Sequence, residues 1–174
     1  VEESAKRFEK REKIKCYTGD YEEFLENVDA VYIASPNETH FEYAKKAIEA
    51  GKHVLSEKPL SFTKKESEVL YTSAKEKGVV LMEAVKAAYC PGFQQLINVA
   101  KSGKIGDIVD VEASFTRLAD PLSRERTDAE YGGAFLEFGP SVLVPVIKLM
   151  GKDYTSATFD SIYDGNGVDL YTKV

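Results

Sequence analysis

Residues 28–60 read VDAVYIASPNETHFEYAKKAIEAGKHVLSEKPL, and the order of elements in this stretch decides the fold class. The run 30–34 is almost entirely apolar, which predicts a short strand that is buried on both faces. Residues 53–56 predict a second short strand. A strand, a helix and another strand in succession are typical of a parallel sheet covered by helices.

The segment between these two strands has the pattern of a helix. Phe41, Ala44 and Ile48 recur at the spacing of one helical face. Asn37 precedes the helix as a candidate N-cap, and Gly51 follows it where glycine commonly ends a helix.

The alternation continues on the C-terminal side. Thr63 and Glu66 form a capping-box pattern at the start of a helix that ends at Gly78. Residues 79–82 predict another apolar strand.

The alternation of strands and helices also extends toward the N-terminus. Residues 3–13 are rich in good helix formers, residues 14–18 predict a short strand, and Asp20 is a candidate cap for a short helix. Residues 14–82 together therefore predict a parallel sheet with covering helices.

The pattern changes in the second half of the chain, which predicts an α+β arrangement with a mainly antiparallel sheet. Its predicted elements are helices at 91–101 and 132–150, a half-exposed strand at 108–115, a long polar loop at 119–131, and two antiparallel strands at 155–163 and 168–174.

Composition excludes several classes of function. Lys and Arg number 23 against 29 Asp and Glu, for a net charge of −6, which argues against a nucleic-acid partner. The most apolar stretch is interrupted by Pro145 and Lys148, so no membrane span is expected. Cys16 and Cys90 have neither a disulfide framework nor metal-ligand spacing, so we expect a cytoplasmic protein without a bound metal.

Polar residues follow both strands of the opening stretch, at the edge where ligands bind to open parallel sheets. Each of the two groups has two possible interpretations. Either group could form a ligand site. Alternatively, the group after the first strand is simply a helix cap and turn, and the group after the second strand is a solvated charge pair. The candidate ligand residues are Ser35, Pro36, Asn37 and His40 after the first strand, and Glu57, Lys58 and Pro59 after the second.

Lys58 carries the most specific chemistry of these candidates. An ammonium at a strand tip can hold a substrate hydroxyl, stabilise developing alkoxide charge and exchange a proton. The bond from Lys58 to Pro59 is a candidate cis peptide bond.

The two stretches 28–37 and 50–60, with His40 between them, resemble the Gfo/Idh/MocA oxidoreductase family. Residues 81–84, Leu-Met-Glu-Ala, resemble its trans-dihydrodiol dehydrogenase branch. Residues 103–107 and 132–139 resemble the family's link into its second domain and its glycine-rich helix start. Each motif is weak alone, but the ordered set spans most of residues 17–151.

The resemblance implies α/β architecture: a partial Rossmann-like parallel sheet in residues 1–88, followed by part of an α+β substrate and oligomerisation domain in residues 89–174. It implies NAD or NADP as cofactor and homo-oligomers formed through the C-terminal sheet. The substrate would be a sugar, polyol or dihydrodiol that exchanges a hydride at a carbinol carbon.

The resemblance also implies roles for individual residues. Lys58 would be the catalytic lysine at the nicotinamide end of the cofactor. The other residues implied to line the cofactor are Ser35, Pro36, Asn37, His40, Glu57 and Pro59.

The chain departs from the family pattern in several places. It has no G-x-G-x-x-G motif, so we expect a central fragment of a longer enzyme. Glu137 and Ser141 stand where the family usually has Asp and then His or Tyr, and Ala88 stands where it usually has Arg. Glu137 can accept or orient a proton, or it can be simply a carboxylate near the start of a helix.

Three hypotheses follow. The first is a nicotinamide-dependent oxidoreductase with Lys58 and Glu137 as catalytic residues. The second is a non-catalytic NAD(P)-binding sensor on the same fold, suggested by the departures at Glu137, Ser141 and Ala88. The third is a scaffold segment that binds nucleotide poorly and self-associates through unpaired sheet edges.

Overall fold

The computed structural model describes residues 2–174 and divides them into two compact units. The first comprises the chain up to Ser56 together with Leu60–Met82, and the second comprises Glu57–Pro59 together with Glu83–Val174. Because Glu57–Pro59 belongs to the second unit, the predicted catalytic lysine lies with the C-terminal part of the chain.

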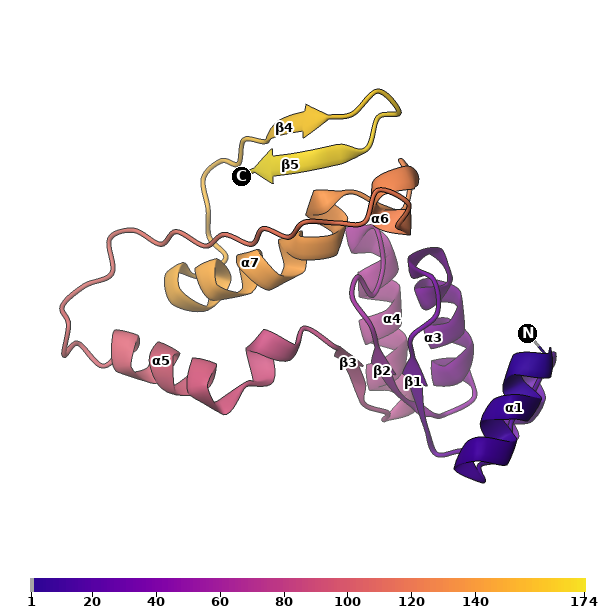
Figure 1. Cartoon of the computed structure of the whole chain (residues 1–174). Coiled ribbons are helices and arrows are strands. Elements are labelled where there is room, and N and C mark those ends of the chain that lie inside the picture. The colour runs from indigo at the N-terminus through magenta and orange to yellow at the C-terminus, as the bar shows by residue number, and fades with distance from the viewer. Residues whose placement is uncertain (1) are drawn as a thin grey trace. The chain divides into compact units, whose positions relative to one another are not determined.

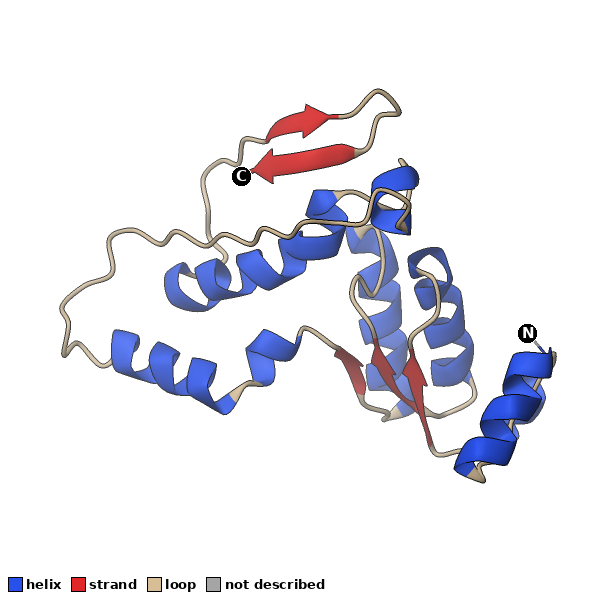
Figure 2. Ribbon diagram, viewed as in Figure 1, coloured by secondary structure: helices blue, strands red, loops and turns tan. Residues whose placement is uncertain are grey.

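The first unit contains a parallel pair of strands with helices packed against it (Figures 1 and 2). The three-stranded sheet has the order β1-β2-β3, and β1 runs parallel to β2 with Ile33 opposite Ser56. The elements are α1 (Glu2–Glu12), α2 (Tyr21–Glu26), β1 (Ala30–Ile33), the 3-10 turn η1 (Asn37–Thr39), α3 (His40–Glu49), β2 (His53–Ser56), α4 (Lys64–Lys77) and β3 (Leu81–Glu83).

The core of the first unit lies between the sheet and helices α3 and α4, which pack side by side (Figure 1). Val31, Ile33 and Val54 are buried against these helices. Tyr32 and Leu55 point to the opposite face and are 58% and 38% exposed. The prediction of a strand buried on both faces is therefore wrong for this chain, because helices cover one face.

Local end signals account for the starts of α2 and α4. Asp20 caps α2 by accepting from the N–H groups of Glu22 and Glu23, and Thr63 and Glu66 form the predicted capping box of α4. The predicted N-cap at Asn37 is wrong. Asn37 begins the 3-10 turn, and Thr39 precedes α3 without a side-chain cap.

Two predicted strands do not form. Residues 14–18 and 108–115 are irregular, and no strand among residues 2–174 pairs with either of them. Val109, one of the apolar residues of the predicted half-exposed strand, is 88% exposed. An alternating pattern is insufficient because strands are stabilised by cross-strand partners.

The second unit combines helices with an antiparallel hairpin (Figure 2). The predicted helices at 91–101 and after Gly133 are confirmed, and a short helix occupies part of the predicted polar loop. The elements are the 3-10 turn η2 (Lys86–Tyr89), α5 (Pro91–Lys101), α6 (Arg124–Thr127), α7 (Ala134–Met150), β4 (Asp160–Tyr163) and β5 (Asp169–Lys173). Among residues 2–174, none of these helices is both long and apolar enough to cross a bilayer.

Candidate active site

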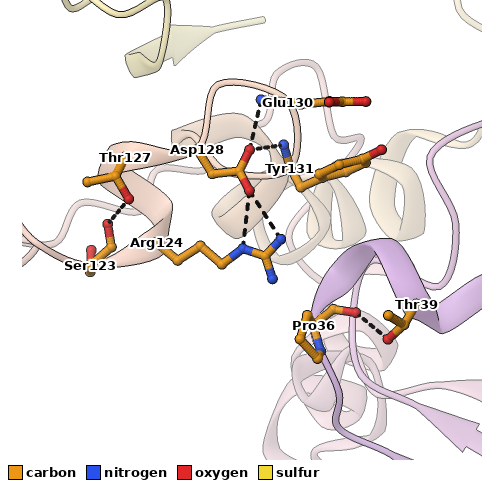
Figure 3. Close-up of polar contacts among 8 residues, drawn as sticks. All are labelled: Pro36, Thr39, Ser123, Arg124, Thr127, Asp128, Glu130 and Tyr131. Atoms are coloured by element: carbon orange, nitrogen blue, oxygen red, sulfur yellow. Dashed lines mark hydrogen bonds and ion pairs between the residues drawn. The ribbon is translucent and has the colours of Figure 1, made fainter.

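The residues after β1 form a tight polar turn. The Ser35 hydroxyl lies 2.6 Å from the Thr39 hydroxyl. The Thr39 hydroxyl donates to the Pro36 carbonyl at 2.7 Å (Figure 3). The Pro36 carbonyl also accepts from the Thr39 N–H at 2.9 Å. Thr39, which sequence reasoning missed, thus holds the loop that carries Ser35, Pro36 and Asn37.

His40 closes this turn from inside the protein. Its side chain is 1% exposed, and its Nε2 lies 2.9 Å from the Ser35 carbonyl oxygen. A carbonyl can only accept, so Nε2 carries the proton in this hydrogen bond. His40 therefore supports the loop as a buried donor, whereas Pro36 is exposed at its surface.

The residues after β2 follow Ser56, which lies opposite Ile33 at the end of β1. Glu57 and Lys58 are half-buried and Pro59 is buried, and the peptide bond between Lys58 and Pro59 is cis. The two strands therefore end at the same edge of the sheet, as the sequence predicted.

Lys58 and Glu137 come together in the second unit. The Lys58 Nζ donates to the Glu137 backbone carbonyl at 2.6 Å and lies 2.9 Å from its Oε1 atom. The side chains are 19% and 23% exposed, so the ion pair is shielded but reachable by solvent. An ammonium has three N–H donors, and Glu137 engages two of them.

A folded loop precedes the helix that carries Glu137. The Asp128 carboxylate accepts from the Arg124 side chain and from the N–H groups of Glu130 and Tyr131 (Figure 3). The Tyr131 N–H in particular, together with Arg124, lowers the pKa of Asp128. The Gly132 N–H then donates to the Asp128 carbonyl, which ties the loop to the glycine pair before α7.

The remaining departures from the family pattern lie in the second unit. Ser141 is half-buried within α7, one turn after Glu137. Ala88 lies in η2, where its carbonyl accepts from the Gln94 side chain. Neither residue supplies the basic or guanidinium group usual in the family.

A hollow of about 390 Å³ adjoins β1 in the first unit. Aromatic side chains dominate its wall, and burial, more than the nearby Tyr43 and Glu22, raises the pKa of Tyr21 to about 12. The wall also includes Ala34 and Ser35, so the hollow reaches the predicted ligand edge of the sheet.

The residues at this edge fit the polar groups of a dinucleotide. The hydroxyl of Ser35 and the amide of Asn37 offer donors and acceptors suited to ribose hydroxyls and a carboxamide. Among residues 2–174, no three His, Cys, Asp or Glu side chains lie close enough together to hold a metal ion.

These features define an α/β protein with polar residues at the ends of its parallel strands, and comparisons with known proteins identify its family. A family model described as "Oxidoreductase family, NAD-binding Rossmann fold" matches residues 1–85. The chain belongs to this family, Gfo/Idh/MocA.

Named relatives come from bacteria and primates. The dTDP-3,4-didehydro-2,6-dideoxy-alpha-D-glucose 3-reductase of Actinomadura kijaniata is 38% identical over 78% of this chain and 41% of its own length. The scyllo-inositol 2-dehydrogenase (NADP(+)) of Bacillus subtilis is 36% identical over 80% and 45%. The trans-1,2-dihydrobenzene-1,2-diol dehydrogenase of Macaca fascicularis is 31% identical over 78% and 41%.

A solved structure matches much of the fold. The 3-ketoreductase KijD10 from A. kijaniata, crystallised with TDP-benzene and NADP in an open conformation, superposes with a TM-score of 0.72 at 33% identity. The match covers 92% of this chain and 47% of that one. The chain thus spans less than half the length of these curated relatives.

Proposed function

We propose that this protein is an NAD(P)-dependent oxidoreductase that moves a hydride between nicotinamide and a carbinol carbon of a sugar, polyol or dihydrodiol. The family assignment supports the cofactor class. The relatives' names support the substrate class, because a sugar reductase, an inositol dehydrogenase and a diol dehydrogenase all change the oxidation state of a hydroxyl-bearing carbon.

The observation that carries the proposal is the contact between Lys58 and Glu137. A lysine that directly follows a strand tip is held by two acceptors of a single residue, at 2.6 and 2.9 Å. Glu137 thereby fixes the direction of the ammonium, and the third N–H is available for a substrate oxygen. Fixed donors of this kind stabilise charge that develops on oxygen during a reaction.

The roles of the residues follow from this arrangement. The bound nicotinamide supplies or accepts the hydride. Lys58 holds the substrate oxygen, and in the reductive direction it gives that oxygen the proton that completes the hydroxyl. Glu137 fixes the direction of the Lys58 side chain. In the oxidative direction the Lys58 amine takes the hydroxyl proton.

We further propose that the first part of the chain binds the cofactor. Ser35, Pro36 and Asn37 would line it along one strand tip, with His40 fixing their loop. Glu57 and Pro59 would also line the cofactor, on either side of Lys58 in the chain. Residues 1–88 would then bind the dinucleotide. Residues 89–174 would bind substrate and form homo-oligomers through the C-terminal sheet.

Fluorescence titration and turnover test the proposal in the full natural chain. NADH and NADPH are titrated separately, and oxidation and reduction are assayed on sugars, polyols and dihydrodiols with their ketones. Lys58→Met should retain cofactor binding and lose about 10²–10⁴-fold in kcat, the usual contribution of proton transfer. Lys101→Met, an exposed lysine in α5, is the matched control. Absent cofactor binding, or full turnover by Lys58→Met, would refute the proposal.

A second candidate function is a non-catalytic NAD(P) sensor. The observation that favours it is the side-chain set around α7, where Ser141 and Ala88 lack the basic groups usual in the family. The same titrations separate the two functions, because a sensor binds NADH or NADPH but turns over no substrate in the panel.

A further inference from the structure

The first turn of α7 donates a hydrogen bond to a carboxylate that lies far along the chain. Oδ2 of Asp169, in β5, accepts from the Phe135 N–H at 2.8 Å and from the Thr172 hydroxyl at 2.9 Å. The Phe135 N–H is one of the first amides of α7, which have no acceptor within the helix. Asp169 therefore caps α7 across the chain, while Thr172 holds its carboxylate in place.

Gly133 allows this close approach. A Cβ atom on Gly133 would lie 1.8 Å from Oδ1 of Asp169, well inside any tolerable contact. The residue also has a φ of +92°, which favours glycine. The carboxylate is thus seated directly against the backbone at which the helix begins.

The capped backbone leads directly to Glu137. The Gly133 carbonyl accepts the helical hydrogen bond of the Glu137 N–H at 3.2 Å. The Glu137 carbonyl and carboxylate in turn hold Lys58. A short series of contacts therefore runs from Asp169 through the first turn of α7 to the lysine ammonium.

The cap also has an electrostatic effect. The unpaired N–H groups of a helix start carry partial positive charge, which a carboxylate stabilises. The Glu137 side chain, in the first turn of α7, provides a second carboxylate, which forms an ion pair with Lys58. The two acidic residues thus have separate partners: Asp169 accepts a hydrogen bond from a helix amide, and Glu137 forms an ion pair with the lysine.

We propose that Asp169 is a positioning residue for the Lys58–Glu137 pair, and through that pair for proton transfer to substrate. The proposal rests on the proposed function for its catalytic consequence. Its geometric consequence, a fixed Lys58 ammonium, does not depend on turnover.

The test compares Asp169→Ala and Asp169→Asn with Asp164→Ala in the full natural chain. Asp164 is a matched control because its carboxylate also accepts backbone N–H groups in the same hairpin, those of Asn166 and Val168. Circular dichroism checks that each variant is folded. Asn keeps an acceptor for the Phe135 N–H, so Asp169→Asn should retain most of the function that Asp169→Ala loses.

Two readouts are measured on the same proteins. In turnover, Asp169→Ala should lower kcat by about 10- to 100-fold, as expected for a displaced catalytic group, with little change in the KM for cofactor. In competitive acetylation read by mass spectrometry, it should raise the labelling of Lys58 relative to Lys101 several-fold. Asp164→Ala should change neither readout.

The outcomes separate the two proposals. If the unsubstituted protein shows no turnover but Asp169→Ala raises the acetylation of Lys58, the proposed function fails and the positioning role stands. If the parent turns over substrate and folded Asp169→Ala matches Asp164→Ala in both readouts, the positioning role is overturned. A folded Asp169→Asn that is as impaired as Asp169→Ala would also overturn it.

Discussion

The ammonium of Lys58 and the carboxylate of Glu137 form an ion pair at 2.9 Å although the two residues are 79 positions apart in the chain. One residue follows a strand and the other lies in the first part of a helix. Both side chains are mostly shielded from solvent, so the pair is less screened than an exposed one. Four predictions follow from this pair and from the elements that support the candidate site.

Glu137→Gln should lower kcat/KM by about 10- to 100-fold. The substitution removes the charge that orients Lys58, and a hydrogen bond to a charged group contributes about 1.5–3 kcal/mol. The backbone carbonyl of residue 137 remains as an acceptor, so the lysine is loosened rather than released. Steady-state kinetics measures the change, with the exposed Glu130→Gln as control. Unchanged kinetics in Glu137→Gln would show that the carboxylate has no part in the reaction.

Gly133→Ala should destabilise the fold by about 1–3 kcal/mol, because its backbone conformation is unfavourable for other residues. The added methyl group would also collide with Asp169. Gly92→Ala is the matched control in α5, where an added Cβ meets no atom within 4 Å and the φ is not positive. The control should be neutral or more stable by up to about 1 kcal/mol. Urea unfolding compares the two, and equal stability would contradict the prediction.

His40→Phe should cost about 1–3 kcal/mol of stability, because it leaves the Ser35 carbonyl without its buried donor. His53 provides the comparison, since its exposed Nδ1 accepts from the Val80 N–H and water can replace it. Thermal unfolding should therefore show a larger decrease for His40→Phe than for His53→Phe. A larger effect at His53 would mean that the His40 contact does not stabilise the loop.

The turn that joins β4 to β5 should lose its local hydrogen bonds in acid. Backbone N–H groups, first that of Val168 and then that of Asn166, lower the pKa of Asp164 below its usual value of 3.8. A carboxyl whose pKa is lower in the folded state stabilises the fold above its unfolded pKa, and this contribution is lost as the pH falls through the folded pKa. The amide shifts of Asn166 and Val168 should titrate with a midpoint below 3.8. Asp164→Asn should abolish that titration, and a midpoint above 3.8 would contradict the assignment.

Much of the fold could be predicted because its signals act over a few residues. The capping box of Thr63 and Glu66 lies within one helical turn, and Gly78 ends the same helix in the left-handed conformation. The parallel pairing of β1 with β2 also follows from the short strand-helix-strand order. These features depend on backbone geometry that neighbouring residues largely determine.

Strand formation shows where this local information ends. Residues 108–115 alternate apolar and polar side chains, yet they form no strand in the part of the chain described here. A strand needs hydrogen-bonding partners that come from elsewhere, and the exposure of Tyr32 and Leu55 likewise depends on which elements cover each face. A single segment carries no information about its distant neighbours.

The candidate site divides in the same way. The sequence alone determined that Lys58 follows a short strand and that Glu137 lies in the first turn of a glycine-preceded helix, because both facts depend on residues close in the chain. Only the tertiary structure decided that these two side chains meet and that Asp169 caps the helix between them. Such contacts depend on how whole elements pack, and packing is set by shape and burial summed over many residues rather than by any local pattern.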